Sequence, residues 1–235
     1  MSPKGKTAKA PKASTRRYGQ YCPVAKSLDV LGERWTLLVV RTLMMGPQRY
    51  TDLREALPGL ATDLLTARLR TLEGAGYLER RQLPRPASVM VYQLTPAGQR
   101  IALVVLELGR IGLARLGPPA HDDLVTSDAL VLSLRPSFRP EVAGEAEESY
   151  RLELDGESYV VSVHPGWAET GRGTASDPQL SLTASTQTFA ALISGAVDAD
   201  AALSAGDLSI DGSRRALDRF LAIFSYPVPS EPAAT

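Results

Sequence analysis

The sequence predicts an α+β protein with two domains, on three observations. The chain has 235 residues, of which 44% are hydrophobic, enough for one large domain or two small ones. Residues 1–120 carry 19 Lys and Arg against 8 Asp and Glu, a net charge of +11, whereas residues 121–235 carry 7 against 18, a net charge of −11. Between these halves, Gly117-Pro118-Pro119 ends a long helical pattern. The basic half suits a polyanion, although chance drift between two solvated surfaces would give the same split.

These observations divide the chain into five segments. Residues 1–17 are rich in Lys, Pro, Ala and Ser, and we expect a disordered basic arm that touches a nucleic-acid backbone or only aids solubility. Residues 18–117 form the first predicted domain, and residues 118–126 form a linker. Residues 127–226 form the second predicted domain, and residues 227–235 form a flexible tail.

Four helices are expected in the first domain before any strand. Their periodic apolar residues place them at Pro23–Leu31, Arg34–Met45, Thr51–Leu57 and Thr62–Glu73. Gly46-Pro47 stops the second helix, and Thr51 is the expected N-cap of the third. In the fourth helix, Leu65, Leu69 and Leu72 form a stripe to be buried. The opposite face carries Asp63, Thr66, Ala67 and Arg70.

Two strands and a long helix complete the first domain. The strands are expected at Tyr77–Arg81 and Val89–Leu94, and the loop between them has a basic tip at Arg85. Thr95-Pro96 is an N-cap and first-turn pair for a helix that runs to about Leu116. Its apolar stripe is wide for one domain to cover, so we expect a C2 homodimer that uses this helix. The stripe consists of Ile101, Val104, Val105, Leu108 and Ile111.

This order of helices and strands is that of a winged helix-turn-helix. The fourth helix would enter the major groove of DNA, and the loop, or wing, would bring Arg85 to the narrow minor groove. We therefore expect a double-stranded DNA operator as the partner. The expected contacts are Arg49, Thr51, Thr62, Asp63, Thr66, Ala67, Arg68, Arg70, Arg80, Arg81 and Arg85. Two of these residues have an alternative to a DNA contact. Arg70 would be only a solvated charge on the helix, and Arg68 would brace the helix against its neighbours.

Three stretches of this half resemble the HxlR-type branch of MarR-like regulators. They are CPVAKSLDVLGERWTLLVVRTL, RYTDLREALPGLATDLLTARLRTLEGAGYLERR and VYQLTPAG, and the resemblance covers about residues 20–117. It implies a dimer that pairs through terminal helices and binds a pseudo-palindromic operator. The family usually has Ser before the recognition helix and often Lys two residues later, where this chain has Ala61 and Asp63. We expect Thr62 to act as the cap and Asp63 to accept from cytosine.

Cys22 is the only cysteine, so no disulfide can form within the chain. In relatives of the HxlR type a cysteine at this place can sense oxidation, and Lys26, one helical turn away, would favour the reactive thiolate. The alternative is a small buried residue of the first helix. No metal or other cofactor is expected, since only His121 and His164 could join this cysteine as ligands.

The second half mixes strands with helices and contains no Lys. Alternating apolar residues predict strands at Tyr150–Leu154, Tyr159–Val163, Leu180–Ala184 and Leu208–Asp211. Asp155-Gly156 is a hairpin signal between the first two of these strands. Helices are expected at Ser127–Arg135, Thr186–Ser194, Ala199–Leu203 and Ser213–Phe224.

The stretch LSLTASTQTFAALISGAVDADAALSAGDLSIDGSRRALDRFLAIF resembles the C-terminal half of sterol-carrier-type lipid-transfer domains. The resemblance covers about residues 127–225, and it implies an apolar cavity for a fatty, sterol or other apolar effector. The side chains expected to line this cavity are Phe138, Trp167, Phe189, Leu192, Ile193, Phe220, Ile223 and Phe224. The alternative is that these side chains simply fill a core.

Together these features predict a bacterial, cytoplasmic transcription regulator that binds DNA as a dimer and responds to an apolar small molecule. Two alternatives stay open: the second domain is only a dimerisation or protein-docking scaffold, or Cys22 senses oxidation. A lipid carrier or enzyme with an accessory basic domain would leave the recognition helix and wing unexplained. The sequence shows no nucleophile paired with a base, so nothing in it indicates an enzyme. No apolar run reaches the about 18 residues that span a membrane, and no signal peptide is expected.

Overall fold

The computed structural model describes residues 17–86, 88–117 and 123–226. Several predicted features lie outside these residues. They are the basic arm up to residue 16, the linker residues 118–122 with His121, one residue of the wing loop (87) and the predicted tail.

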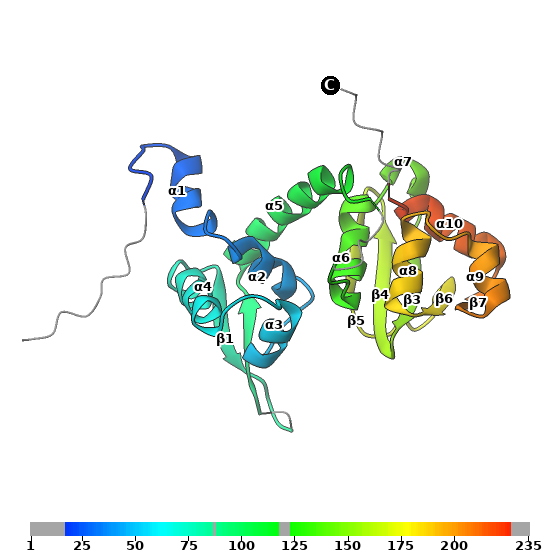
Figure 1. Cartoon of the computed structure of the whole chain (residues 1–235), viewed down its shortest axis with the longest axis horizontal. Coiled ribbons are helices and arrows are strands. Elements are labelled where there is room, and N and C mark those ends of the chain that lie inside the picture. The colour runs from blue at the N-terminus through cyan, green and yellow to red at the C-terminus, as the bar shows by residue number, and fades with distance from the viewer. Residues whose placement is uncertain (1–16, 87, 118–122, 227–235) are drawn as a thin grey trace, which may run out of the picture.

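The first half of the chain has the predicted winged helix-turn-helix fold (Figure 1). The strands β1 and β2 pair antiparallel, with Leu78 opposite Leu94 and Gln82 opposite Met90. The elements in chain order are α1 (Pro23–Leu31), α2 (Thr36–Leu43), α3 (Tyr50–Ala56), α4 (Thr62–Gly74), β1 (Leu78–Gln82), β2 (Met90–Leu94) and α5 (Pro96–Leu113).

The core of this half forms where α4 packs against α2. Leu65, Leu69 and Leu72 are at most 2% exposed, which confirms the predicted stripe. Val39 and Val40 of α2 are fully buried in the same core. Since this stripe occupies the inner side of α4, the outer side is left to solvent.

In the first half, the helix α2 begins later than predicted and the helix α5 ends earlier than predicted. Trp35 has a left-handed backbone with a φ of 77°, so α2 begins at Thr36 rather than at Arg34. Such a backbone cannot continue a right-handed helix. Helix α5 ends at Leu113 rather than near Leu116.

Two predicted caps are wrong. The carboxylate of Asp52 accepts a hydrogen bond from the backbone N–H of Arg49 at 2.9 Å, and Arg49 is the N-cap of α3, so Thr51 lies inside the helix. In α4 the N-cap is Ala61, which has no side-chain oxygen, and Thr62 is the first helical residue. In α3 the carboxylate of Asp52, inside the first turn, takes the place of a side-chain cap. A cap of this kind is harder to predict from the sequence than a Ser or Thr at the N-cap.

The second half is an α+β layer structure, as predicted. Its five strands form one sheet in the order β5-β4-β3-β6-β7, in which β3 and β6 are parallel and the other neighbours are antiparallel. The elements are α6 (Ser127–Ser137), α7 (Pro140–Ala143), β3 (Glu148–Leu154), β4 (Glu157–His164), β5 (Trp167–Arg172), β6 (Leu180–Ala184), α8 (Thr186–Ile193), α9 (Ala199–Ala205), β7 (Leu208–Gly212) and α10 (Arg214–Phe224). The sequence did not predict α7 or β5.

The core of the second half lies between one face of the sheet and the helices α6, α8 and α10 (Figure 1). Alternate residues of the strands point into it, among them Leu152, Val161 and Leu182, which are fully buried. The intervening residues of β3 and β4 are partly exposed, which is the pattern of a sheet covered on one face.

A packed boundary joins the two halves along α5 and α6. Met45 and Leu113, at the ends of the helices α2 and α5, are buried in the core of the second half. Gly109 of α5 faces Pro136 of α6 so closely that a Cβ on Gly109 would lie 3.1 Å from the Pro136 Cγ atom. Ile101, nearer the start of α5, is buried in the core of the first half. Helix α5 therefore belongs to both cores.

Candidate nucleic-acid interface

The outward face of α4 presents side chains that the fold does not use. Asp63, Ala67 and Arg70 are exposed. Within the described part of the chain, Arg70 has no hydrogen bond or ion pair. The carboxylate of Asp63 accepts the N–H of Leu64 at 2.9 Å, which holds it at the start of the helix. This face can offer a free cation and a fixed acceptor to a partner.

Thr66 and Thr62 also serve the packing of α4 against α3. The Thr66 hydroxyl donates to the Thr62 carbonyl at 2.9 Å and lies 3.2 Å from the hydroxyl of Tyr50, which itself donates to the Thr62 carbonyl at 2.9 Å. Tyr50 thus sets the angle between the two helices, a role for which the sequence shows no signal.

Arg68 braces α4, as one of the two interpretations had it. Its Nε donates to the carbonyl of Arg34 at 3.1 Å, and its guanidinium forms an ion pair with Glu33 at 2.9 Å. Its side chain is only 14% exposed. Because these contacts tie α4 to the turn before α2, the guanidinium points into the protein.

The wing carries three of the predicted arginines, and they differ in their contacts. Arg80 on β1 forms an ion pair with Glu73 at 2.9 Å, and this hydrogen bond raises the pKa of its guanidinium. Arg81 and Arg85 are exposed and, among the described residues, form no ion pair. The wing therefore has two free cations and one that is already paired.

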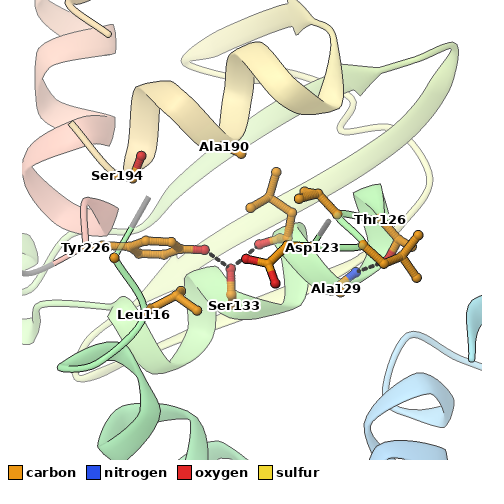
Figure 2. Close-up of a pocket in the computed structure, with 12 residues that line it drawn as sticks. Leu116, Asp123, Thr126, Ala129, Ser133, Ala190, Ser194 and Tyr226 are labelled. Carbon is orange, nitrogen blue, oxygen red and sulfur yellow. Dashed lines mark hydrogen bonds between the residues drawn. The ribbon is translucent and has the colours of Figure 1, made fainter. Parts of the chain in front are cut away.

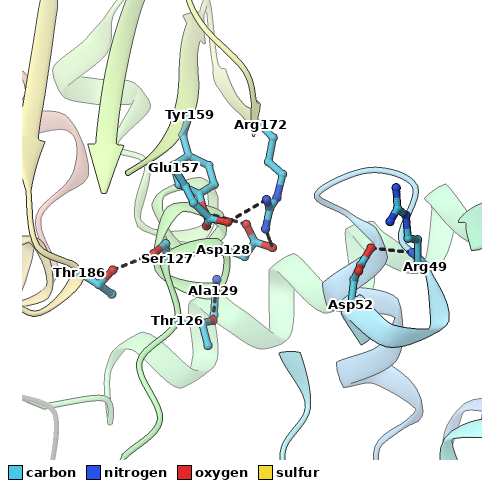
Figure 3. Close-up of polar contacts among 10 residues, drawn as sticks. All are labelled: Arg49, Asp52, Thr126, Ser127, Asp128, Ala129, Glu157, Tyr159, Arg172 and Thr186. Atoms are coloured by element: carbon cyan, nitrogen blue, oxygen red, sulfur yellow. Dashed lines mark hydrogen bonds and ion pairs between the residues drawn. The ribbon is translucent and has the colours of Figure 1, made fainter. Parts of the chain in front are cut away.

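The start of α3 adds further positive charge. Figure 3 shows that Asp52 holds the backbone N–H of Arg49 while the Arg49 guanidinium points away from it. Arg49, Thr51 and Arg54 are exposed, and neither arginine forms an ion pair within the described residues. Free arginines thus come from α3, α4 and the wing, the elements that this fold sets around a duplex.

Helix α5 exposes a row of large apolar side chains. Leu103, Val104, Leu108 and Ile111 are between 47% and 66% exposed. Ile101, predicted in the same stripe, is buried in its own core. A groove of about 930 Å³ runs between α1 and α5, with Leu28, Val104 and Leu108 among its walls.

Cys22 lies at the edge of this region, immediately before α1. It is half-buried, and its carbonyl accepts the N–H of Lys26 at 3.0 Å. It is a free thiol.

The second half contains a pocket of about 310 Å³ between α6, α8 and the segments on either side of residues 118–122 (Figure 2). Most of its wall is apolar, and its polar atoms include the hydroxyls of Ser133 and Tyr226, which hydrogen-bond to each other. Burial raises the pKa of Tyr226 to about 12. The residues that line the pocket are Leu116, Gly117, Asp123, Leu124, Val125, Thr126, Ala129, Leu130, Ser133, Ala190, Ser194 and Tyr226.

Most of the side chains predicted to line a cavity are instead in the packed core, which is the alternative that the sequence left open. Those at most 4% exposed are Phe189, Leu192, Ile193, Phe220, Ile223 and Phe224. The Phe220 ring lies 5.1 Å from the rings of Tyr150 and Phe224, so these aromatic side chains fill the volume that a cavity would need. Phe138 and Trp167 line a separate groove against α5.

A polar network holds the start of α6 to the sheet (Figure 3). The carboxylate of Asp128 accepts from the Tyr159 hydroxyl at 2.9 Å and from Arg172 at 2.8 Å. Arg172 also pairs with Glu157 at 3.1 Å. Burial, and then the neighbouring carboxylates, raise the pKa of Tyr159.

Two kinds of feature are absent from the described residues. No group of His, Cys, Asp and Glu there has the arrangement of a metal site. In the same part of the chain, no helix is long and apolar enough to cross a membrane.

The first half has the fold of a winged helix-turn-helix protein, with free arginines on α3, α4 and the wing. The HxlR-like helix-turn-helix model matches residues 30–118, and the SCP-2 sterol transfer family model matches residues 130–225. This chain belongs to the HxlR-like helix-turn-helix family and carries a sterol-carrier domain in addition.

Its relatives in the first half are transcriptional regulators. The HTH-type transcriptional regulator sll1512 of Synechocystis is 37% identical over 94 residues, 40% of this chain and 70% of that protein. YvaP of Bacillus subtilis is 34% identical over 44% of this chain and 96% of its own length. YodB of the same organism is 34% identical over 37% of this chain and 79% of its own length.

Solved structures match the same half. The reduced form of YodB from B. subtilis is 30% identical, with a TM-score of 0.36, over 43% of this chain and all of that one. The redox regulator HypR in its oxidised form is also 30% identical, with a TM-score of 0.36, over 39% of this chain and 94% of that one.

Proposed function

We propose that this protein is a sequence-specific regulator that binds a double-stranded DNA operator as a homodimer and responds to a small apolar molecule. The observation that carries the DNA-binding part is the outward face of α4. It offers an unpaired Arg70 beside the free arginines of α3 and the wing. Free arginines on a folded surface suit a polyanion, because each contact with a phosphate releases condensed counterions.

Each group has a distinct role in this proposal. Arg70 reads a guanine through the major groove, and Asp63 accepts from a cytosine, because these pairings fit the edges of the bases. Arg85 enters the narrow minor groove, where the potential is most negative. Arg49, Thr51, Arg80 and Arg81 contact the backbone, whereas Arg68 supports α4 from inside.

The test is the affinity of the whole protein for fragments of its own promoter region, measured by fluorescence anisotropy as salt is raised. With six or more phosphate contacts per dimer, affinity should fall by about 10³-fold between 50 and 200 mM salt. A protein whose affinity for every fragment is absent or independent of salt would contradict the proposal.

The apolar row on α5 and the groove beside it support the proposed homodimer. A second copy that buries Val104 and Leu108 would remove an exposed patch that a soluble monomer rarely keeps. The two recognition helices would then reach successive major grooves about 34 Å apart.

Light scattering of two variants tests the homodimer. Leu108→Glu should give a monomer, whereas Val197→Glu, a similar change at an exposed site in the second half, should stay dimeric. A wild-type monomer at micromolar concentration would contradict this part of the proposal.

The effector site in this proposal is the pocket of Figure 2. Its volume of about 310 Å³ is at the lower end of the roughly 300–1,000 Å³ typical of ligand pockets, so it favours a small apolar molecule over a sterol. Two of its walls, Leu116 and Val125, flank the connection between α5 and α6. If the two halves can pack in two arrangements, a ligand in this pocket shifts the balance between them. The size of the shift is set by the difference between its affinities for the two arrangements.

The test of this site adds decan-1-ol and cholesterol to the protein and measures operator affinity. Ala129→Phe, which narrows the pocket, should abolish the response, and Ala201→Phe, on exposed α9, should keep it. Operator DNA must change the affinity for the alcohol by the same factor, because coupling is reciprocal. A ligand that binds without changing operator affinity would leave the second domain as a scaffold.

A redox response through Cys22 is the second candidate. The half-buried thiol lies two residues before Val24, which lines the groove between α1 and α5 that the dimer would bury. The relative YodB has been solved in reduced, diamide-treated and quinone-bound forms. With no second cysteine in the chain, oxidation would have to link two copies or a small thiol. Operator affinity should then change on diamide treatment in the wild type and not in Cys22→Ser.

A further inference from the structure

Besides the pocket of Figure 2, a second hollow lies between the two halves. It has a volume of about 540 Å³ and opens between α5, the end of α6 and the edge strand β5. Its apolar walls are Leu103, Val104, Leu106, Phe138, Trp167 and Ala168, and its charged walls are Glu107, Arg110 and Arg135. We call it the Arg135 groove.

The charge of this groove comes from one residue. Arg110 and Glu107 form an ion pair with each other, so their charges cancel. Arg135 forms no ion pair with any described residue, and its Nε atom is buried without a hydrogen-bond partner. Arg172, Arg214 and Arg219 of the same half are instead tied to carboxylates. The groove therefore has one positive charge without an ion-pair partner among the described residues.

A half-buried guanidinium whose buried Nε has no partner is unfavourable for the fold. A buried donor without a partner costs more than a hydrogen bond gains, and the cost is larger for a charged group. Burial lowers the pKa of Arg135, and the longer-range attraction of Glu169 on β5 only partly offsets this. An anion that entered the groove would give this guanidinium a counter-charge.

The walls define what else such an anion needs. Trp167 is 50% exposed although it is a large aromatic side chain, and its ring stacks on His164 at 4.2 Å, which holds it in place. Leu103 and Val104 are also more than half exposed. An inorganic anion would leave these apolar surfaces in water, whereas a molecule with an apolar body would cover them.

We propose that the Arg135 groove binds an amphiphilic carboxylate, with the carboxylate on Arg135 and the apolar body between Trp167 and α5. The planar guanidinium matches a carboxylate in geometry, and a charge-assisted hydrogen bond is stronger than a neutral one. This site differs from the pocket of Figure 2 in its position and in its need for a charge. It also touches Val104, which lines the groove between α1 and α5, so its occupant would meet the helix through which we propose the dimer forms.

Calorimetric titration of the whole protein, without DNA, tests this site separately from the proposed regulation. The probes are decanoate, decan-1-ol and inorganic phosphate. Arg135→Gln should weaken decanoate binding by about tenfold or more, the usual range for a lost hydrogen bond to a charged group. The same change should leave any binding of decan-1-ol unaltered. Arg215→Gln, which removes an exposed arginine of α10, should not change decanoate binding.

Three results would overturn the proposal. The first is that decanoate binds Arg135→Gln as tightly as it binds the wild type, or that it does not bind the wild type. Another is phosphate that binds as tightly as decanoate, since the apolar walls would then contribute nothing. The third comes from thermal unfolding of Arg135→Met without ligand. Its Tm should be equal to the wild type or a few degrees higher, because an unpaired charge is removed, and a lower Tm would show that Arg135 has a structural role.

Discussion

Five exposed arginines of the first half and three arginines of the second half differ in their contacts. In the first half Arg49, Arg54, Arg70, Arg81 and Arg85 are exposed and form no ion pair among the described residues. In the second half Arg172, Arg214 and Arg219 each pair with one or two carboxylates. These five arginines of the first half are therefore available to a partner, whereas the three named in the second half hold the fold together.

This difference would allow a chain with no net charge to bind a polyanion, as proposed. The charges +11 and −11 cancel only when the two halves are added, and a duplex would meet one half at a time. The acidic surface of the second half would repel DNA, which would direct binding to the face with α4 and the wing. The comparison predicts that substitutions of the unpaired arginines of the first half affect DNA affinity, and that substitutions of the paired arginines of the second half affect stability.

The largest expected effect concerns the core of the second half. Phe220→Ala removes a fully buried ring that contacts Tyr150 and Phe224, and it should lower the free energy of unfolding by about 3–5 kcal/mol. Urea denaturation followed by circular dichroism measures this loss. If Phe220 lined a loosely filled cavity, the loss would be below about 2 kcal/mol, and the description of a packed core would fail.

A smaller effect is expected at Arg219. Its guanidinium pairs with Glu148 at 2.6 Å and donates to the Ala143 carbonyl at 3.0 Å, which fixes α10 against β3 and the end of α7. Because the side chain is 38% exposed, solvent screening limits the contribution, and Arg219→Ala should cost about 1 kcal/mol of stability. Operator affinity should not change. A loss of DNA binding at unchanged stability would break the comparison between the halves.

The smallest effect is a dependence on alkaline pH. Burial raises the pKa of Tyr226 from 10.0 to about 12, and burial also raises the pKa of Tyr150 and Tyr159. The unfolded chain then loses these protons at a lower pH than the folded chain. The stabilisation is fully present below pH 10 and is lost as the pH rises toward 12. The free energy of unfolding of Tyr226→Phe should fall less steeply than that of the wild type between pH 10 and 12. Identical pH profiles of the two proteins would contradict the raised pKa of Tyr226.

Much of the fold could be predicted from local patterns. The leucine stripe of α4, the Thr95 cap and the hairpin at Asp155-Gly156 are encoded within a few residues, and the structure has all three. Strand β5 escaped prediction because its inward residues are Ala168 and Thr170, which give no apolar alternation. Its place at the edge of the sheet is decided by pairing with β4, which no local pattern shows.

The candidate sites divide in the same way. The exposure of Arg70 follows from the helical period, so the sequence predicts it. The bracing of Arg68 by Glu33 joins residues 35 positions apart, and the sequence left it as one of two interpretations. The pocket of Figure 2 and the Arg135 groove were not predicted, because both form where α6 meets elements of other parts of the chain.

The most direct test of the central claim compares Arg70→Ala with Arg215→Ala, two exposed arginines in opposite halves. The measurement is affinity for the operator and for a random duplex of equal length at one salt concentration. Arg70→Ala should reduce the preference for the operator by about 1–3 kcal/mol, the value of a bidentate contact to a base, while Arg215→Ala leaves it unchanged. Equal losses on both duplexes would show that Arg70 contacts only phosphate. No loss on either would contradict α4 as the recognition helix.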